Sequence, residues 1–207
     1  MVGYGELGKQ FFDFLKVSNP QITESIFFDD NLFRINKNSA YSFNNFTNEE
    51  FGDYEFYVSL GYLYLKSKSE VINKLLDLGR KLPVFIHPTT FVNSTTKLGH
   101  NTFVYPMCNI DKECLIGKGV LINNSVTLSH NNIIGDCCYI SPGVTTSGYV
   151  EIGENSFIGI GTIISNKIKI GKNVKIGIGS VINRDIPDGC SAIGNPVKIL
   201  DKELNLL

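Results

Sequence analysis

The chain has 207 residues, a length that suits one large domain or two small ones. Its 19 basic and 20 acidic residues give a net charge of −1, so the sequence has no electrostatic footprint for nucleic acid or an anionic membrane surface. No apolar run approaches the roughly 20 residues that a membrane span needs, and the first residues lack the pattern of a signal peptide. The five cysteines are odd in number and form no CxxC pair. This argues against a disulfide framework or a zinc site and favours a reducing, cytoplasmic location.

The first 84 residues alternate between strand-like and helix-like segments. A glycine-rich turn, GYGELG, opens a segment with helical character over 6–16, and residues 24–30 follow as a strand that ends in Asp29 and Asp30. Residues 54–61 predict a second strand, residues 69–79 a helix, and residues 83–86 a last strand. This order predicts a small β-α-β unit with a parallel sheet.

The glycine-rich turn places Gly3, Gly5 and Gly8 in a GxGxxG pattern. In a dinucleotide-binding fold this pattern lets the backbone approach phosphates at a helix N-terminus, with an acidic residue about 20 positions later. Asp29 stands 21 residues after Gly8, but only two residues are left for the preceding strand. From the residues alone, the motif is either a phosphate-binding turn or a plain tight turn. Asp29 and Asp30 are either a binding pair or a solvated strand end.

From residue 86 onward the sequence repeats with a period of six. In steps of six from Ile86 to Ile182, sixteen of seventeen positions are aliphatic, the exception is Thr146, and the frame does not slip. A second inward position, four residues further on, is mostly small or β-branched. Glycine often follows the aliphatic residue, where we expect it to ease tight corners. A helix needs a period near 3.6 and a half-buried strand a period of two. A six-residue repeat instead predicts a parallel β-helix, in which stacked coils bury the aliphatic column.

His130 lies where this repeat is disturbed. A coil of three hexapeptides has about 18 residues, so each residue stacks on those 18 positions away, and His130 falls between Lys112 and Gly148. In the same coils Thr146 interrupts the aliphatic column and Asn132 replaces a small residue in the second column. Because a regular repeat needs only packing, polar residues in its inward columns indicate a site. His130 is therefore a candidate catalytic base, and the alternative is a polar residue that happens to lie in a turn.

The hexapeptides IGENSF, IGIGTI and IGKNVK resemble the repeats of the left-handed β-helix acyltransferases. With the N-terminal unit, essentially the whole chain resembles the bacterial nucleotide-sugar N-acetyltransferases that act on bacillosamine precursors, perosamine and dideoxy-amino sugars. The resemblance implies a Rossmann-like nucleotide-sugar-binding domain over residues 1–84. Residues 85–207 would form a left-handed β-helix acyltransferase domain with a C-terminal closing segment. It further implies transfer of an acetyl group from acetyl-CoA to the amino group of a UDP-, dTDP- or GDP-linked sugar. The enzyme would be a cytoplasmic homotrimer without a metal, active in polysaccharide (O-antigen) biosynthesis.

The same resemblance gives His130 the role of general base, because VTLSHNNIIG matches the family's catalytic segment. The next family position often carries a carboxylate that orients the imidazole. Here it is Asn131, whose amide oxygen can still accept a hydrogen bond from Nδ1. Gly148 corresponds to the backbone N–H that stabilises the oxyanion. A second family histidine aligns with Tyr139, which leaves Tyr139 as a substrate contact.

Further binding residues follow from the resemblance in the same way. The substrate-binding set is Gly3, Gly5, Gly8, Asp29, Asp30, Gly61, Tyr62, Tyr139 and Ser141. The acetyl-CoA-binding set is Gly148, Gly159, Gly161, Pro196 and Lys198. Lys167, Lys169, Lys172 and Lys175 make the later part of the repeat basic, which suits either CoA phosphates or a solvated face.

The sequence leaves several alternatives open. We expect His87 to mark the domain junction and His100 to be solvated or to lie between subunits. Their spacing from His130 shows no paired-ligand pattern, which disfavours a metal enzyme of the γ-carbonic anhydrase type. Thiol catalysis at Cys137 and Cys138 is the alternative to a histidine base, although Cys138 falls in the second inward column, where it should fill the core. The alternative functions are sugar O-acetylation of the sialic-acid type and a non-catalytic nucleotide-sugar-binding β-helix protein.

Overall fold

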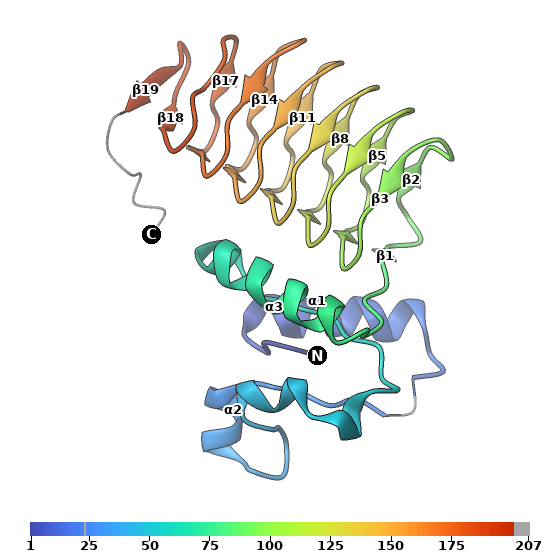
Figure 1. Cartoon of the computed structure of the whole chain (residues 1–207). Coiled ribbons are helices and arrows are strands. Elements are labelled where there is room, and N and C mark those ends of the chain that lie inside the picture. The colour runs from blue at the N-terminus through green and yellow to red at the C-terminus, as the bar shows by residue number, and fades with distance from the viewer. Residues whose placement is uncertain (23, 201–207) are drawn as a thin grey trace. The chain divides into compact units, whose positions relative to one another are not determined.

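The computed structural model describes residues 1–22 and 24–200 (Figure 1). The chain divides into two units, Met1–Phe85 and the part that begins at Ile86. The helices belong to the first unit: α1 (Glu6–Ser18), α2 (Asp30–Ile35), α3 (Leu65–Asp77), and the short 3-10 helices η1 (Phe43–Thr47), η2 (Glu49–Phe51) and η3 (Tyr62–Tyr64). Within the ranges just given, no helix is long and apolar enough to cross a membrane.

The sheet of the N-terminal unit consists of single-residue bridges. Parallel bridges join Tyr41 to Phe28, Phe28 to Val2, Val2 to Val58, and Glu55 to Lys81. Aromatic rings pack around them: Phe28 is 2% exposed, and its ring centroid lies 5.0 Å from that of Phe51. Aromatic side chains bury a large apolar area each, so they stabilise a sheet that has few ladder hydrogen bonds of its own.

Two strands predicted for this unit are much shorter than expected. In the segment 24–30 only Phe28 is bridged, and Asp29 does not end a strand but caps the N-terminus of α2, where its side chain accepts hydrogen bonds from two backbone N–H groups. Aspartate favours this position because its carboxylate satisfies the exposed donors of the first helical turn. In the segment 54–61 only Glu55 and Val58 form bridges. The helix expected over 6–16 is confirmed by α1, and the one expected over 69–79 is α3, which begins at Leu65 and ends at Asp77.

The second unit is a parallel β-helix built from two-residue strands. They are β1 (Phe85–Ile86), β2 (Phe91–Val92), β3 (Lys97–Leu98), β4 (Phe103–Val104), β5 (Asn109–Ile110), β6 (Leu115–Ile116), β7 (Leu121–Ile122), β8 (Thr127–Leu128), β9 (Ile133–Ile134), β10 (Tyr139–Ile140), β11 (Thr145–Thr146), β12 (Glu151–Ile152), β13 (Phe157–Ile158), β14 (Ile163–Ile164), β15 (Lys169–Ile170), β16 (Lys175–Ile176) and β17 (Val181–Ile182). The three-residue strands β18 (Ser191–Ile193) and β19 (Lys198–Leu200) form an antiparallel pair at its end.

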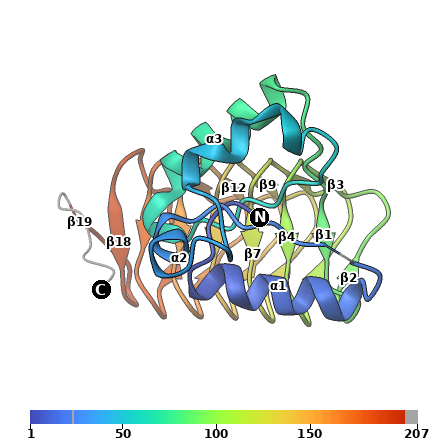
Figure 2. The same cartoon turned by 90° about the horizontal axis from the view of Figure 1, so that it is seen from below.

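Up to β17, each strand of the β-helix pairs with the strand that stands three places later in the chain, so the coils form three sheets. Their orders are β1-β4-β7-β10-β13-β16-β18-β19, β2-β5-β8-β11-β14-β17 and β3-β6-β9-β12-β15. Figure 2 shows β4 beside β7 and β9 beside β12, as this order requires. Up to β17, paired residues are 18 positions apart, as in Tyr139 opposite Phe157, whereas β16 and β18 pair residues 16 positions apart. The coil length predicted from the period of six is confirmed.

The aliphatic column forms the core of the β-helix. All of its members from Val104 to Ile182 are buried, including Thr146, whereas Ile86 in the first coil is 42% exposed. Stacked coils therefore bury the column as predicted, and only the first coil leaves it open.

The corners of the β-helix require glycine for a different reason from the expected one. The glycines that directly follow a residue of the aliphatic column, such as Gly99 and Gly153, do not have positive φ values. A Cβ at Gly99 would lie 2.5 Å from the Lys118 nitrogen, and a Cβ at Gly153 would lie 2.6 Å from the Gly171 carbonyl carbon. Positive φ values of 54° to 69° occur instead at every sixth residue from Asn101 to Gly179, with many residue types. Glycine after the aliphatic residue is thus explained by the close stacking of coils, not by the turn itself.

Candidate active site

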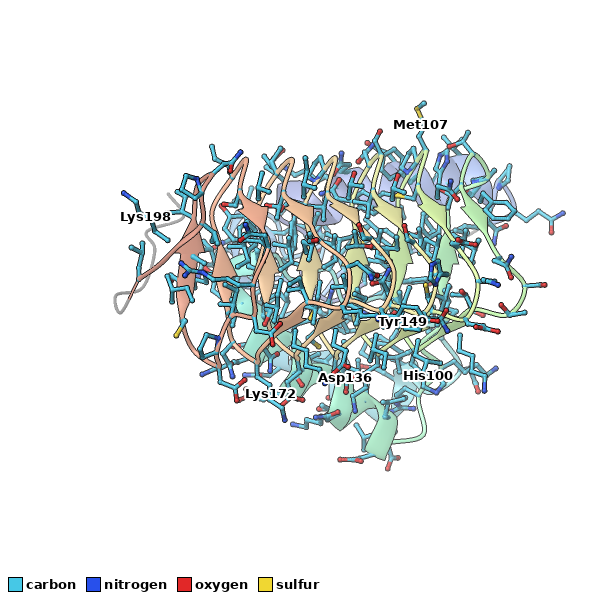
Figure 3. The ribbon with its side chains drawn as sticks, turned by 90° about the horizontal axis from the view of Figure 1, so that it is seen from above. His100, Met107, Asp136, Tyr149, Lys172 and Lys198 are labelled. Atoms are coloured by element: carbon cyan, nitrogen blue, oxygen red, sulfur yellow. The ribbon has the colours of Figure 1, made fainter. Side chains whose placement is uncertain are left out.

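His130 lies at the corner between β8 and β9, against Gly148 of the next coil. A Cβ at Gly148 would be 2.6 Å from His130 Cε1 and 2.7 Å from Nε2, so only glycine leaves room for the ring. The ring of Tyr149, labelled in Figure 3, stands edge-on to the imidazole, with centroids 5.1 Å apart and planes at 86°. His130 is half-buried, Gly148 is buried and Tyr149 is exposed. The two residues that the 18-residue stacking makes neighbours are in direct contact.

The two polar residues that interrupt the inward columns bond to each other beneath this corner. Asn132 Nδ2 donates to Thr146 Oγ1 at 2.9 Å, and the Val150 N–H donates to Asn132 Oδ1 at 2.8 Å. Asn132 Nδ2 also lies 3.2 Å from the Ser147 carbonyl oxygen. Both side chains are buried, and buried polar groups are stable only when they are hydrogen-bonded. The network therefore ties the chain around His130 to the chain around Gly148.

Asn131 connects the imidazole to a carboxylate of the preceding coil. The His130 Nδ1 and Asn131 Oδ1 atoms are 2.9 Å apart, and Asn131 Nδ2 donates to Glu113 Oε2 at 2.8 Å. With Nδ1 facing an amide oxygen, Nδ1 carries the proton and Nε2 keeps its lone pair. The arrangement can take a proton from a substrate at Nε2.

Backbone groups around Gly148 complete the corner. The Tyr149 N–H donates to the His130 carbonyl at 3.1 Å, and the Gly148 carbonyl accepts from the Lys167 N–H at 3.0 Å. Among residues 1–22 and 24–200, no hydrogen bond uses the Gly148 N–H. A backbone donor with no protein partner, beside a histidine, is suited to bind an oxygen that develops negative charge.

Cys137 and Cys138 are both buried, and Cys138 does not supply a nucleophile. Cys138 is 1% exposed, and its Sγ donates to the Gly153 carbonyl at 3.1 Å. Burial raises the pKa of the Cys138 thiol to about 12. Because the thiolate is the reactive form, Cys138 is inert near neutral pH and fills the core, as expected.

The basic end of the repeat is partly neutralised. Lys169 pairs with Glu151 and Lys172 with Glu154, each at 3.1 Å and each one coil apart. Figure 3 shows Lys172 and Asp136 along one edge of the β-helix. The excess of positive charge at this end is therefore smaller than the lysine count of the sequence indicates.

In the N-terminal unit the three glycines of GYGELG have three different environments. Gly3 has a φ of +85°, which favours glycine, and Gly8 packs so closely that a Cβ would be 2.6 Å from the Gly3 carbonyl oxygen. Gly5, the N-cap of α1, has no atom within 4 Å of its would-be Cβ. The turn is therefore tight at its start, open in its middle and closely packed at its end.

Asp29 and Asp30 both accept backbone hydrogen bonds. Asp29 accepts from the Tyr4 N–H of the glycine turn at 2.8 Å and from two N–H groups of α2 at 3.0 Å. Asp30 accepts from the Phe43 N–H at 2.9 Å and the Ser42 hydroxyl at 2.8 Å. These bonds, first of all the one from Phe43, hold the pKa of Asp30 below its ordinary value. Asp29 thus fixes the glycine turn to α2.

The other predicted substrate-binding residues divide between the two units, with Gly61 and Tyr62 in the first and Tyr139 and Ser141 in the second. Gly61 is the N-cap of η3, and Tyr62 is half-buried at its start. The Tyr139 hydroxyl accepts from Asn123 Nδ2 at 3.2 Å, and Ser141 is buried just after β10. Since β10 and β8 belong to different sheets, the structure does not bring Tyr139 and Ser141 onto the corner of His130 within one chain.

The predicted acetyl-CoA residues also differ in their surroundings. Gly159 is closely packed, with the Ile176 carbonyl oxygen 2.6 Å from a would-be Cβ, whereas Gly161 has a φ of +67° and open space around it. Pro196 follows a cis peptide bond, and Lys198 is exposed on β19. Gly161 and Lys198 are therefore accessible positions of this set, while Gly159 serves the stacking of coils.

The remaining histidines have no role at this corner. His87 lies just after the boundary between the units, with Nδ1 2.9 Å from the Thr89 hydroxyl, and His100 is exposed. Across the described part of the chain, no group of three or more His, Cys, Asp or Glu side chains could hold a metal ion.

The sequence reasoning missed Glu113 and Tyr149. Both follow from the rule that placed Gly148 beside His130, because Glu113 and Tyr149 stand 18 residues before and after Asn131. The rule gives the neighbour, but the direction of its side chain depends on rotamers, which a repeat pattern does not contain.

No protein-family model and no curated protein matches the chain. Solved structures do. The chain is 30% identical to the acetyltransferase domain of PglB from Neisseria gonorrhoeae in complex with acetyl coenzyme A, over 96% of both chains and with a TM-score of 0.84. PerB from Caulobacter crescentus, in complex with CoA and GDP-perosamine, is 26% identical over 96% of this chain and 94% of that one, with a TM-score of 0.87. A histidine-to-alanine mutant of GDP-perosamine N-acetyl transferase from Caulobacter crescentus, with the same two ligands, is 25% identical over 97% and 95%, with a TM-score of 0.87.

Proposed function

The chain belongs to the family of β-helix acetyltransferases that includes the acetyltransferase domain of PglB, and from this membership we propose its reaction. It transfers an acetyl group from acetyl-CoA to the amino group of a nucleotide-linked amino sugar. The observation that carries the proposal is the His130 imidazole against Gly148, in a fold shared over 96% of the chain with structures that hold acetyl-CoA or CoA. That a histidine-to-alanine mutant was prepared for a relative of this fold agrees with a histidine at the reaction centre.

His130 acts as the general base in this reaction. A sugar amine is mostly an ammonium ion near neutral pH and cannot attack a thioester until it loses a proton, which Nε2 accepts. The amine nitrogen then forms a bond to the thioester carbonyl carbon, and the carbonyl oxygen becomes an oxyanion that the Gly148 N–H stabilises. When the carbon–sulfur bond breaks, the CoA thiolate leaves and takes a proton from the imidazolium. The nitrogen releases its second proton to solvent, so the ammonium substrate yields the amide, CoA thiol and one free proton. Binding of both substrates at one corner supplies further acceleration through proximity.

The N-terminal unit holds the nucleotide as a Rossmann-like domain. Its bridges place the parallel segments in the order Tyr41, Phe28, Val2, Val58 and Lys81. Successive segments are added on one side of Val2 up to Tyr41 and on the other side from Val58 onward, so the strand order switches between Val2 and Val58. Ligands of open α/β sheets bind at such a switch point, beyond the carboxyl ends of the strands. Gly3 and Gly61 follow these two segments, and the open side of Gly5 at the start of α1 leaves room for phosphate oxygens. Asp29 and Asp30, with Tyr62, complete the proposed nucleotide site.

The acyl donor and the sugar take the outer surface of the β-helix. Acetyl-CoA lies along the later coils, near Gly148, Gly159 and Gly161, and reaches the closing segment at Pro196 and Lys198. Apolar side chains near these glycines are exposed, with Ile160 56% and Ile178 68% exposed. They offer an apolar contact surface for the pantetheine arm of CoA or for a neighbouring subunit.

A homotrimer of left-handed β-helices accounts for the place of Tyr139 and Ser141, which lie on a different sheet from His130. Tyr139 and Ser141 would contact the sugar from a neighbouring subunit of such a trimer. We place the enzyme in the cytoplasm and in polysaccharide biosynthesis of the O-antigen type, because its donor is acetyl-CoA and none of its five cysteines forms a disulfide.

The proposal is tested by release of CoA thiol from acetyl-CoA in the presence of UDP-, dTDP- and GDP-linked amino sugars. We expect turnover with at least one amino sugar and no turnover with the matched sugar that has a hydroxyl group in place of the amine. Turnover of the hydroxyl compounds alone would show O-acetylation instead. Binding of a nucleotide sugar, with no release of CoA thiol in the presence of any of the sugars, would favour a non-catalytic binding protein.

A further inference from the structure

We propose that Glu113 is a positioning residue that selects the tautomer of His130 through Asn131. The inference rests on the proposed role of His130 as the base and adds a residue to that site. Asn131 occupies the position after His130, where a carboxylate side chain could orient the imidazole. The carboxylate comes instead from the preceding coil, because Asn131 Nδ2 donates to Glu113 Oε2 at 2.8 Å.

The chemistry of the three side chains allows only one arrangement. The ionised Glu113 carboxylate only accepts hydrogen bonds, so Asn131 must turn its NH₂ group toward it. The amide oxygen then faces His130 Nδ1, at 2.9 Å, and can only accept. Nδ1 must therefore carry the proton, and Nε2, near Gly148, keeps the lone pair that the base needs. With the amide reversed, Nδ1 would have to accept and Nε2 would hold the proton.

The corner geometry permits a sharp test of this relay. Glu113, Asn131, Tyr149 and Lys167 occupy equivalent corners of four coils, with φ values of 57°, 57°, 59° and 61°. Lysine is therefore compatible with the backbone conformation of position 113. In Glu113→Lys, the ammonium group donates to Asn131 Oδ1, the amide reverses, and the proton of the imidazole moves to Nε2. In the double variant Glu113→Lys/Asn131→Asp, the new carboxylate accepts from the lysine and from Nδ1 at once, so the original tautomer returns.

The tautomer is read directly by the 15N chemical shifts of the neutral imidazole nitrogens. The chain has three histidines, so His87→Gln and His100→Gln variants assign the signals of His130. We expect a protonated Nδ1 in the native protein, a protonated Nε2 in Glu113→Lys, and a protonated Nδ1 again in the double variant. The same tautomer in the native protein and in folded Glu113→Lys would overturn the proposal, whatever the activity.

Kinetics then connect the tautomer to turnover. We expect kcat of Glu113→Lys to fall at least about tenfold with both KM values within about twofold, and the double variant to regain most of the loss. Asp111→Lys, which makes the same charge change on the same coil, should leave kcat within about twofold. A switched tautomer with native kcat, or a double variant no better than Glu113→Lys, would overturn the positioning role. Neither result bears on thiol release by the native protein, which tests the proposed function separately.

Discussion

The two units of the chain bring their site residues together by different means. In the β-helix, His130 meets Gly148 because each residue stacks on the one 18 positions away, so the contact follows from the repeat. In the N-terminal unit, the Gly3 carbonyl accepts from the Ser59 hydroxyl at 2.6 Å, across 56 residues that no local pattern relates. Where the strand register is fixed by a repeat, the sequence predicts which residues are neighbours in a site. In a sheet of single bridges, the neighbours are set by tertiary packing, which the sequence pattern does not show.

The same chemical change, one added methyl group, should have different effects at the glycines of the two units. In Gly148→Ala the new Cβ would lie 2.6 Å from His130 Cε1, so the imidazole must move from its place. We expect kcat to fall at least about thirtyfold, because general-base catalysis depends on hydrogen-bond reach to the substrate. Steady-state kinetics with thermal unfolding as a control would check this.

Gly153→Ala is the matched control within the β-helix. Its Cβ would meet the Gly171 backbone at 2.6 Å, away from His130, and should cost about 1–3 kcal/mol of unfolding free energy with little change in kcat. Equal losses of stability in the two variants, with equal kcat, would show that Gly148 serves only the stacking of coils.

In the N-terminal unit, Gly5→Ala should act on binding. No atom lies within 4 Å of a Cβ at Gly5, so the melting temperature should stay unchanged. If the open side of the turn holds phosphate oxygens, the methyl group should raise KM for the nucleotide sugar about tenfold and leave KM for acetyl-CoA unchanged. Gly8→Ala, which clashes with the Gly3 carbonyl, should instead lower stability. A native KM in Gly5→Ala would remove Gly5 from the nucleotide site.

Thr146→Val tests whether the hydrogen bonds of the polar corner affect catalysis as well as stability, in contrast to the apolar contacts of the regular coils. Valine keeps the shape but removes the Oγ1 acceptor of Asn132 Nδ2, so we expect a loss of about 1 kcal/mol and a small fall in kcat. Ile164→Val, one coil further along the same column, should lower stability by a similar amount with no effect on kcat. Denaturant unfolding and kinetics on both variants separate the two cases. Native kcat in Thr146→Val would mean that the network does not position His130.

The last prediction concerns the stability of the β-helix core at alkaline pH. The Cys138 thiol titrates at about 8.5 in an unfolded chain, whereas burial raises its pKa in the folded protein to about 12. The unfolded state alone loses the proton between these values, so the stabilising effect is complete below about pH 8.5 and declines as pH rises toward 12. Urea unfolding as a function of pH should show this decline, and Cys138→Ala should make it shallower. Parallel curves for the two proteins would contradict the assignment.

Much of the β-helix could be predicted from the sequence because each six-residue repeat corresponds to one side of a coil. The aliphatic column predicts the coil length, the pairing of strands and the contact of His130 with Gly148. The exceptions Thr146 and Asn132 predict the polar corner. The prediction that glycine after the aliphatic residue eases a tight corner was wrong. The structure shows that glycine is needed there because the next coil lies too close for a Cβ, and the repeat does not show the distance between coils.

The N-terminal unit could be predicted only in part for the opposite reason. The two long helices follow from their apolar periodicity, but a strand that pairs through one residue, such as Phe28, has no period to detect. Asp29 looked like the end of a strand, although aspartate before a short helical segment is also a good N-cap, and local sequence does not separate the two.

The most direct test of the central claim is the turnover of His130→Ala, measured with acetyl-CoA and an accepted nucleotide amino sugar. The dissociation constant for the sugar is measured on the same sample. We predict that kcat falls at least about a hundredfold while the dissociation constant stays within about twofold, since the base acts in the chemical step and not in nucleotide binding. A folded His130→Ala variant that binds the sugar and turns over at the native rate would contradict the assignment of His130 as the base.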